Sequence, residues 1–455
     1  MFLRDICDRS VFCRGTKRNY FIVNNAMTAI PISELGEPFY IGSVQKLYGV
    51  DSDDSVMVTQ TTNQGSVFDV GALFEIPGSD VARAVFRHVL YSEMAKPELW
   101  KEVLDGIRAT EDLDDVYRDE LLTGAMEDVC ERGARTHHEG MIDALSGEIC
   151  HRGLPENPSA YNVVRKYQIL KPEEIQFLGA HLYDYAKFPH EDGFVIPLEY
   201  IVRFGITSGS SVYRKYLKMD AAARQSFERE LGVNEALEAW KMLQRPVSDC
   251  TSKFEPEDRM VSKQEALVMS GLAGDMWVKS GKMAVLGACF VRHLLDKIGL
   301  CLWDIKWEFA KDGEDVVFVD TIDTDSFRAT GFVDHKGCRY VMNYNKQSMR
   351  DYFLIAHSDW TDAINDAKGR AAQQGVAFTE LLKAGQEAGT YAATPDVAEQ
   401  FMAIQVVKMD LIKQHMLGAK QPEEIKVGLL KAGEEEIKFY EGLGKLDEFA
   451  KLNGV

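Results

Sequence analysis

The sequence predicts a fold of mixed strands and helices, because three stretches of the chain carry clear and different patterns. The opening, from Phe39 to Thr62, alternates apolar and polar residues as strands do. Residues 300–320 repeat this alternation on both sides of Asp312-Gly313, a dipeptide typical of tight hairpin turns. The region after Thr394-Pro395 instead spaces its apolar residues as an amphipathic helix does.

The N-terminal part is predicted to be a sheet with a helical segment appended to it. Phe39–Tyr48 and Ser55–Thr62 are its first expected strands, and Asn162–Leu170 is a later one. Between them, from about 94 to 150, the chain becomes helical and acidic, with the run Glu111–Asp115. We interpret this acidic stretch as a solvated helical insertion.

The second half begins with a change of pattern after Lys171-Pro172, which opens an expected helical excursion. A strand returns at Phe194–Arg203, where we expect a second lobe to start. Residues 283–298 form a predicted apolar helix that Gly299 ends. Thr394-Pro395 is an N-cap with proline at the first helical position, so the C-terminal region is predicted to be helical.

Composition limits the classes of function. The 455 residues are 45% hydrophobic and 27% charged, as in an ordinary folded protein of about two or three domains. The net charge of −19 argues against nucleic acid or an anionic membrane as partner. Eight scattered cysteines without a Cys-x-x-Cys pair indicate reduced thiols and no zinc site. With no long apolar stretch, the expected location is the cytoplasm.

The charged strand near residue 306 is the strongest chemical signal. Asp304, Lys306 and Glu308 project to one face of an extended strand, while the apolar residues between them project to the other. Carboxylates suit Mg²⁺, and an ammonium offsets the charge of a polyphosphate during transfer. This pattern predicts a nucleotide site. The competing interpretation is a solvated, charged strand face.

The loop of the following hairpin decides where Asp320 points. A two-residue loop at Asp312-Gly313 would place Asp320 opposite Ile305, on the wrong face. A three-residue loop with Gly313 left-handed places Asp320 opposite Asp304, so that the acids share a face. We predict the three-residue loop.

The segment Leu302–Phe309, followed by Val317–Asp320 and Arg328, resembles the Asp-x-Lys-x-Glu-Phe hairpin of the SAICAR synthetases (phosphoribosylaminoimidazole-succinocarboxamide synthases). Further segments resemble motifs of that family in the expected order, namely Tyr40–Tyr48, Ser66–Asp69, Pro197–Arg203 with Gly209, Ser210 and Arg214, and Lys346–Asp351. The resemblance covers Phe39 to Phe353, interrupted by the acidic stretch and the excursion after Lys171.

The resemblance implies an α+β fold with a kinase-like antiparallel N-terminal lobe, an α/β second lobe, ATP held between them, and C-terminal helices. The implied reaction joins the carboxylate of carboxyaminoimidazole ribotide (CAIR) to the amine of aspartate, with ATP and Mg²⁺, in purine biosynthesis. The implied division is an extension at 1–35, a nucleotide-binding lobe at 36–172 with an insertion at 94–150, a second lobe at 173–345, and a helical region at 346–455. The terminal helices are candidates for a homo-oligomer contact.

The resemblance also assigns roles residue by residue. Glu308 and Asp320 are the implied Mg²⁺ ligands, Lys306 the cation near the transferred phosphoryl group, and Asp304 the residue that orients them. ATP is expected at Gly42, Lys46, Lys166, Glu308 and Asp320, and the ribotide and its carboxylate at Arg203, Gly209, Ser210, Arg214, Arg328, Ser66 and Asp69. The alternatives are a buried ion pair of Arg203 with Glu199, and a simple loop serine at Ser210.

The chain departs from the family pattern mainly in the first lobe. Gly42–Gln45 lacks the family's phosphate-loop lysines, Asn63-Gln64 replaces Asp-Arg, and Ser79 and Thr321 replace a lysine and a glutamate. Each lost cation near a triphosphate removes a charge-assisted contact. Weak ATP binding, a different phosphoryl donor, or compensation by Lys46 and Lys166 are therefore open.

Three functions follow. The first is a SAICAR synthetase. The second is a paralogous ligase that joins an amine to another heterocyclic or ribotide carboxylate in a specialised nucleoside pathway. The third is a nucleotide- or ribotide-binding protein without turnover, which the missing lysines favour and which the intact Lys306, Glu308 and Asp320 disfavour.

Overall fold

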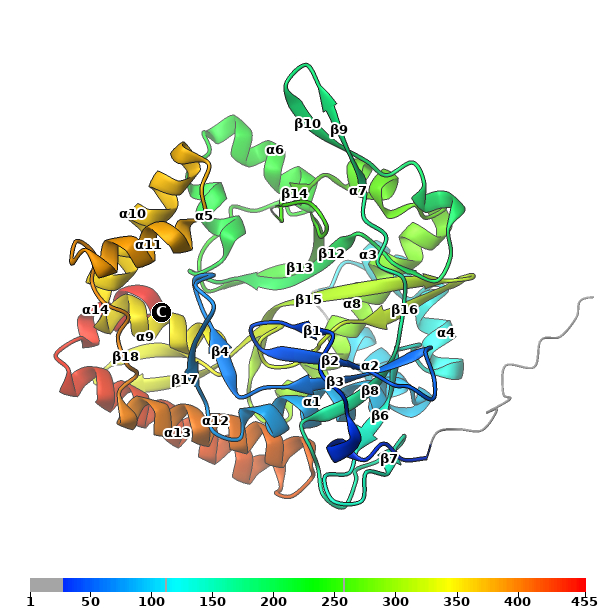
Figure 1. Cartoon of the computed structure of the whole chain (residues 1–455), viewed down its shortest axis with the longest axis horizontal. Coiled ribbons are helices and arrows are strands. Elements are labelled where there is room, and N and C mark those ends of the chain that lie inside the picture. Colours follow the sequence, from blue (N-terminus) through cyan, green and yellow to red (C-terminus); the bar gives the residue numbers. More distant parts are fainter. Residues whose placement is uncertain (1–27, 111–112, 257) are drawn as a thin grey trace, which may run out of the picture.

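A computed structural model of the chain describes residues 28–110, 113–256 and 258–455 (Figure 1). Most of the extension predicted at 1–35 therefore lies outside the described residues. The described part combines antiparallel sheets with helices, which confirms the α+β class. The boundaries of the two lobes and the helical region stay a prediction.

The first sheet has six strands in the order β1-β2-β3-β8-β6-β7. Their bounds are β1 (Tyr40–Ile41), β2 (Gln45–Gly49), β3 (Val56–Thr61), β8 (Tyr161–Arg165), β6 (His138–Ile142) and β7 (Ile149–Cys150). Helix α1 (Ser79–Met94) packs on β3, β6 and β8 with a buried apolar face that includes Val85 and Phe86. Its Arg87 donates hydrogen bonds to Thr59 and Thr61 of β3 (3.1 and 3.3 Å), which ties helix to sheet.

The second sheet has eight strands, in the order β14-β13-β12-β15-β17-β18 with β11 and β16 also paired to β15. Their bounds are β11 (Phe194–Val195), β12 (Leu198–Ile206), β13 (Lys241–Ser252), β14 (Met260–Val261), β15 (Cys301–Asp312), β16 (Asp315–Val319), β17 (Phe327–His335) and β18 (Cys338–Asn343). The predicted apolar helix is present as α8 (Gly274–Asp296), which covers one face of this sheet. A Cβ at Gly287 would lie only 2.8 Å from Phe318, so glycine permits this close packing.

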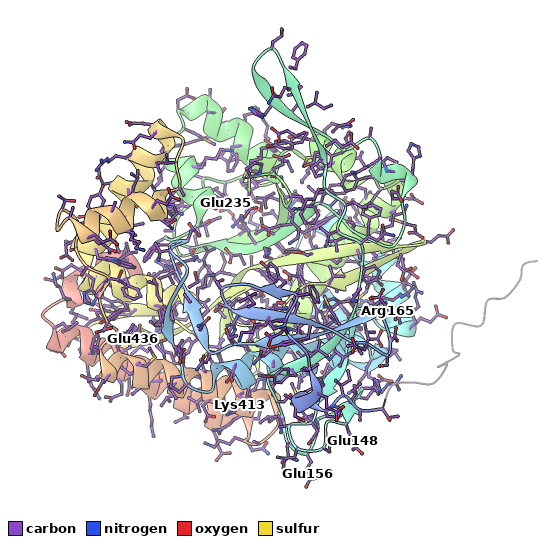
Figure 2. The ribbon with its side chains drawn as sticks, viewed as in Figure 1. Glu148, Glu156, Arg165, Glu235, Lys413 and Glu436 are labelled. Atoms are coloured by element: carbon purple, nitrogen blue, oxygen red, sulfur yellow. The ribbon has the colours of Figure 1, made fainter. Side chains whose placement is uncertain are left out.

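Other helices surround the two sheets (Figure 1). They are α2 (Pro97–Arg108), α3 (Asp115–Leu122), α4 (Ala125–Arg132), α5 (Ser211–Leu217), α6 (Ala221–Leu231), α7 (Lys263–Ser270), α9 (Lys346–Ala356), α10 (Ser358–Gln374), α11 (Phe378–Glu387), α12 (Glu399–Met416), α13 (Pro422–Gly442) and α14 (Leu446–Asn453), with 3-10 turns at Ile32–Glu34 and Phe188–His190. The prediction of a helical C-terminal region is confirmed. A buried ion pair between Lys408 of α12 and Glu436 of α13 joins two of these helices, and Figure 2 labels Glu436.

Two stretches predicted to be helical contain strands. The acidic insertion is helical only to Arg132, and β6 and β7 then enter the first sheet. The excursion after Lys171 is a hairpin of β9 (Glu173–Phe177) and β10 (Ala180–Asp184), which projects at the top of Figure 1. Its turn residues Leu178 and Gly179 both have positive φ (49° and 87°), as in the turns that suit two-residue hairpins.

A third hairpin pairs β4 (Gln64–Ser66) with β5 (Ala72–Glu75). Phe68 and Asp69 in its loop both have positive φ (59° and 64°), a costly conformation for residues other than glycine.

Among the described residues, no helix is both long enough and apolar enough to cross a membrane.

His137 is buried and His138 is half-buried beside Tyr91 of α1. The exposed fraction of His137 is 6%, and its backbone N–H donates to the Phe318 carbonyl (2.8 Å). Burial lowers the pKa of His137 to about 4, with Asp320 opposing and Arg87 adding to the shift. Burial also lowers the pKa of His138.

This depressed pKa predicts that acid destabilises the protein between about pH 6.5 and pH 4. In that range the unfolded His137 binds a proton and the folded one does not, so stability falls as pH falls, by up to about 3 kcal/mol. His137→Phe cannot titrate and keeps a ring beside Tyr91, so it should flatten this slope. Urea unfolding at several pH values measures it, with the exposed His190→Gln as control. An unchanged slope would contradict the assignment.

Candidate active site

The charged strand lies in the middle of the second sheet, and its neighbours present polar residues on the same face. Arg203 of β12 pairs in register with Asp304, and Ile201 pairs with Lys306. On the other side of β12, Asp249 and Thr251 of β13 pair with Ile201 and Glu199. Opposed residues of neighbouring strands share a face. We call this surface the charged face; it contains Glu199, Arg203, Asp249, Thr251, Asp304, Lys306 and Glu308.

The opposite face of β15 is core, as the alternation predicts. Ile305, Trp307 and Phe309 are almost completely buried against α8 and its surroundings. Burial of these side chains fixes the strand's orientation, because a one-residue slip would expose them and bury the charges. The prediction that the charged residues of this strand project to one face and its apolar residues to the core is therefore confirmed.

Lys306 lies among three carboxylates. Its Nζ is 2.7 Å from Glu199 Oε1, 2.8 Å from Glu308 Oε1 and 3.7 Å from Asp320 Oδ2. Burial alone would lower the pKa of Lys306, but the three acids outweigh it and hold the pKa well above its usual value. The ammonium is therefore permanently charged. With 34% of its side chain exposed, it still faces solvent from which a ligand could approach.

Asp320 reaches this cluster by a route that differs from the predicted one. The ladder pairs Asp312 with Asp315 and Glu308 with Val319, so the turn is at Gly313-Glu314 and the predicted three-residue loop is wrong. Continued in register, the ladder would turn Asp320 away from Glu308, since neighbours alternate faces. The strand ends at Val319, however, and the positive φ of Asp320 (68°) redirects the side chain.

The backbone at Asp320 is held in this conformation by helix α1. Tyr91 Oη donates to the carbonyl oxygens of Val319 and Asp320 (3.0 and 3.1 Å). Arg83 of the same helix pairs with Asp323 (3.0 Å) and Asp325 (3.3 Å). These contacts explain how a non-glycine residue keeps a strained φ, because the surroundings over-determine it.

The carboxyl groups of Glu308 and Asp320 hydrogen-bond to each other, so they share a proton. Burial, reinforced by the charge of Asp320, raises the pKa of Glu308 to about 7. Burial would also raise the pKa of Asp320, but Lys306, Lys253 and the hydrogen bond from Glu308 lower it. Lys253 forms a direct ion pair with Glu308. The pair therefore carries about one negative charge below pH 7 and approaches two above it.

This acid pair fits Mg²⁺. Two carboxyl groups in contact share a proton, and a divalent cation would replace that proton. Mg²⁺ commonly binds one or two carboxylates and completes its shell with phosphate oxygens and water. Among the described residues, no group of three or more His, Cys, Asp or Glu side chains is arranged to hold a metal by itself. The site is thus suited to a metal that arrives with a phosphorylated ligand.

Arg203 does not face a ligand in the way predicted. Its Nε and Nη2 donate to both oxygens of Asp249 (2.9 Å each), and its Nη1 lies 3.4 Å from Asp304. Its exposed fraction is only 4%. The alternative of a buried ion pair is the one observed, but the partner is Asp249, not Glu199, which binds Lys306. Arg203 is therefore a buried member of the charged face that holds Asp249 and Asp304 in place.

Asp304 and Arg328 continue this network. Arg328 of β17 pairs with Asp304 (2.5 Å), and 22% of its side chain is exposed. Asp304 is 5% exposed, and its described partners are Arg203 and Arg328. Asp304 thus positions two arginines and has no described contact with Lys306. Of the predicted anion-binding arginines in this network, Arg328 is the one that remains accessible.

Gly209 and Ser210 lie in the loop before α5. The Ser210 hydroxyl is buried (1% exposed) and is without a hydrogen-bond partner among the described residues. A Cβ at Gly209 would lie 3.2 Å from the Gln347 side chain, so glycine allows the loop to approach α9. An unsatisfied buried hydroxyl is a group that a ligand oxygen could satisfy. Arg214, one turn further, is exposed on α5.

Ser66 and Asp69 belong to the β4–β5 hairpin. Ser66 lines a small pocket together with Arg83, Asp325 and Lys346. Asp69 is exposed, and its carboxylate accepts from Lys368 of α10 (2.7 Å). The structure thus brings Ser66 to a pocket that residues of α9 also line, whereas Asp69 contacts α10.

The predicted first-lobe cations are not directed at the acid pair. Lys166 pairs with Asp54 (2.8 Å) near the first residue of β3. Thr61, the last residue of β3, lies about 17 Å from that end, as the rise per residue of a strand gives. Lys46 follows Gln45 in β2 and so projects to the opposite face. Gln45 itself accepts a hydrogen bond from Thr321, next to Asp320. Compensation by Lys46 and Lys166 is therefore not supported, and a neutral pair occupies that position.

Gly42 lies in the turn between β1 and β2, where its N–H donates to the Gln45 carbonyl (2.8 Å). A Cβ there would lie 3.2 Å from the Tyr40 ring, so the close turn favours glycine. Gly42 thus shapes the hairpin that carries Gln45.

Sequence reasoning missed Lys253 and Asp249, which balance the charges of Glu308 and Arg203. The signal available was the alternation of polar residues at Asp249, Thr251 and Lys253, along the end of β13 and the residue after it, which has the same period as the charged strand. From the sequence alone, Gln45 is only a position where the family pattern has a lysine and this chain does not. Its contact with Thr321 depends on how the two sheets meet and has no local signal.

Comparisons with known proteins find similarity to one family of enzymes. Residues 183–367, which carry β12 to β18, match the model of the SAICAR synthetase family. A putative phosphoribosylaminoimidazole-succinocarboxamide synthase of Archaeoglobus fulgidus is 27% identical over 245 residues, which span 53% of this chain and 66% of that protein. The synthase of Thermoplasma acidophilum is 26% identical over 242 residues, 53% of this chain and 69% of that protein.

Solved structures of the same family also align. The SAICAR synthase of Saccharomyces cerevisiae in complex with SAICAR is 16% identical, with a TM-score of 0.48, over 87% of this chain and 99% of that one. A type-2 SAICAR synthetase in complex with ADP is 18% identical, with a TM-score of 0.38, over 68% of this chain and 89% of that one. From the family model and the curated relatives, the chain is a divergent relative of the SAICAR synthetases.

Proposed function

We propose that this protein is an ATP- and Mg²⁺-dependent carbon–nitrogen ligase that joins CAIR to L-aspartate in the cytoplasm. The observation that carries the proposal is the position of Lys306 between Glu199 and the acid pair Glu308–Asp320. The relatedness to SAICAR synthetases supports the same reaction, because the matched residues 183–367 include all four side chains.

In the proposed reaction, a carboxylate oxygen of CAIR attacks the γ-phosphorus of ATP and ADP leaves. The amine of aspartate then attacks the acyl carbon, the bond to phosphate breaks, and nitrogen loses a proton. Glu308 and Asp320 would hold Mg²⁺, which when bound neutralises charge on the phosphoryl oxygens.

The side chains of the chain supply position and charge. The Lys306 ammonium is fixed by three acids, so it can stabilise charge on the phosphoryl group or the substrate carboxylate without reorganising. Glu199 is itself held by Thr251 (3.0 Å). Arg328 and the free hydroxyl of Ser210 are suited to the ribotide phosphate, since arginine and a hydroxyl both donate to phosphate oxygens.

The proposed function is tested by measuring ADP and phosphate release with CAIR, aspartate, ATP and Mg²⁺, and by omitting each in turn. We expect release only in the complete mixture, together with the formation of SAICAR. ADP release that does not need CAIR, or no release at all, would contradict the proposal.

A second candidate is a paralogous ligase that takes another heterocyclic or ribotide carboxylate. The observation that favours it is the neutral Gln45–Thr321 pair beside Asp320, where the family pattern carries charge. The same assay, repeated with other ribotide carboxylates and amines, separates the two. A binding protein without turnover would bind these ligands and release no ADP with any of them.

Arg328→Ala should raise the KM for the ribotide by about tenfold or more and change kcat much less, because it removes a charge-assisted contact to bound substrate. Steady-state kinetics with the ribotide and ATP varied separately measure this. The matched control is Arg339→Ala on β18, an exposed arginine paired with Asp334. An equal rise of KM for ATP would argue against a ribotide contact.

A further inference from the structure

A second cavity lies behind the second sheet, on the side away from the charged face. Its volume is about 350 Å³, which is within the range of small-molecule sites, roughly 300–1,000 Å³. Ser248 and Cys250 of β13 line it, and these residues flank Asp249 of the charged face. Because neighbours in a strand point to opposite faces, the cavity and the charged face are separated by β13 itself.

The floor of the cavity is apolar and aromatic. The buried residues Leu121, Tyr200 and Leu231 line it, together with the partly exposed rings of Tyr117 and Trp277. Flat aromatic walls are suited to a ring, since stacked rings gain contact energy beyond simple burial. Some of the lining residues are exposed, so the cavity is open to solvent.

Three cations line the same cavity. Arg245, Lys263 and Lys282 form no ion pair among the described residues, and Glu120 is the only acid among the described lining residues. Arg245 donates to the Gly232 carbonyl (2.9 Å) and lies over the Tyr117 ring, 5.1 Å from its centre. In a chain with a net charge of −19, an excess of unpaired cations around an apolar floor is a local anion site.

Helix α8 leaves room for a ligand at Gly281. A Cβ built there meets no atom within 4 Å, although the residue lines the cavity. The opposite wall comes from α3, which belongs to the acidic insertion and lies outside the residues that match the family model. The cavity is therefore closed by a part of this chain that the matched region does not contain.

We propose that this cavity binds a small aromatic or heteroaromatic carboxylate, with the ring against Tyr117, Trp277 and Tyr200 and the carboxylate near Arg245, Lys263 and Lys282. The residues that line the cavity determine both parts of this ligand, the ring and the carboxylate. The apolar floor favours the ring, and the unpaired cations favour a single negative charge over a neutral group.

The test is isothermal titration of the full chain with naphthoate and with its neutral amide, naphthamide. We expect saturable binding of one naphthoate per chain, and at least about tenfold weaker binding of the amide, since the charge-assisted contacts are lost. Gly281→Leu fills the space on α8 and should abolish binding of naphthoate. Leucine is a better helix former than glycine, so the variant should remain folded, which its melting temperature checks.

The matched control is Gly274→Ala on the same helix, which also has open space at its Cβ but does not line the cavity. It should bind naphthoate as the wild type does, and so should Lys306→Ala on the charged face. No saturable binding to the wild type, unchanged binding to Gly281→Leu, equal binding of the amide, or loss of binding in Lys306→Ala would each overturn the proposal. These results do not depend on the ligase reaction.

Discussion

Lys306→Ala should lower kcat by about a hundred- to a thousand-fold while the protein stays folded. The ammonium lies 2.7 Å from Glu199 and 2.8 Å from Glu308, so it is already in place when charge develops on the phosphoryl group. A contact made mainly in the transition state affects kcat more than KM. The measurement is ADP release with saturating CAIR, aspartate, ATP and Mg²⁺, together with circular dichroism of the variant.

The matched control is Lys311→Ala on the same strand, whose ammonium donates to the Glu191 carbonyl outside the site (2.6 Å). This control should keep the wild-type rate. If Lys306→Ala also keeps it, Lys306 has no catalytic role and the proposed function loses the observation that carries it. If both variants lose activity and unfold, the strand rather than the charge is responsible.

Arg203→Ala should lower the free energy of unfolding by about 3–5 kcal/mol, a larger effect than on substrate binding. Arg203 is 4% exposed and forms a bidentate pair with Asp249, so its removal leaves a buried carboxylate without compensation. Urea unfolding measures the loss. A sequence-based interpretation, in which Arg203 holds the ribotide phosphate, would instead predict a raised KM in a stable protein.

The double variant Arg203→Met with Asp249→Leu separates these possibilities. Replacing both partners of a buried ion pair by apolar residues of similar volume is often nearly neutral for stability. We therefore expect much of the lost stability to return. A stable Arg203→Ala protein with a strongly raised KM for the ribotide would show that the arginine contacts substrate after all.

The fold was predictable where a local pattern decides it. The alternation along residues 301–312 and the apolar helix that became α8 were confirmed. The predicted N-cap at Thr394 was wrong, because α12 begins only at Glu399 and Ala398 is its N-cap residue. The stretch at 138–150 was mistaken for helix because its strands are short and acidic residues precede them. Their place in the first sheet comes from pairing with β8, which no local pattern records.

The candidate site was predictable in its residues but not in its contacts. Glu308, Lys306 and Asp320 meet as expected, yet the hairpin register that brings them together differs from the predicted one. The positive φ of Asp320 depends on the hydrogen bonds from Tyr91, a residue more than two hundred positions away in the chain. Such support cannot be inferred from the hairpin alone.

The sequence by itself determined which side chains of β15 are charged and which are core, because the alternation of a strand is a property of its own backbone. Only the tertiary structure decided the partners: Asp249 for Arg203, Lys253 for Glu308, and Gln45 for Thr321. Ion pairs and hydrogen bonds are chosen by distance in space, and these partners come from strands and loops that are brought together only when the sheets assemble.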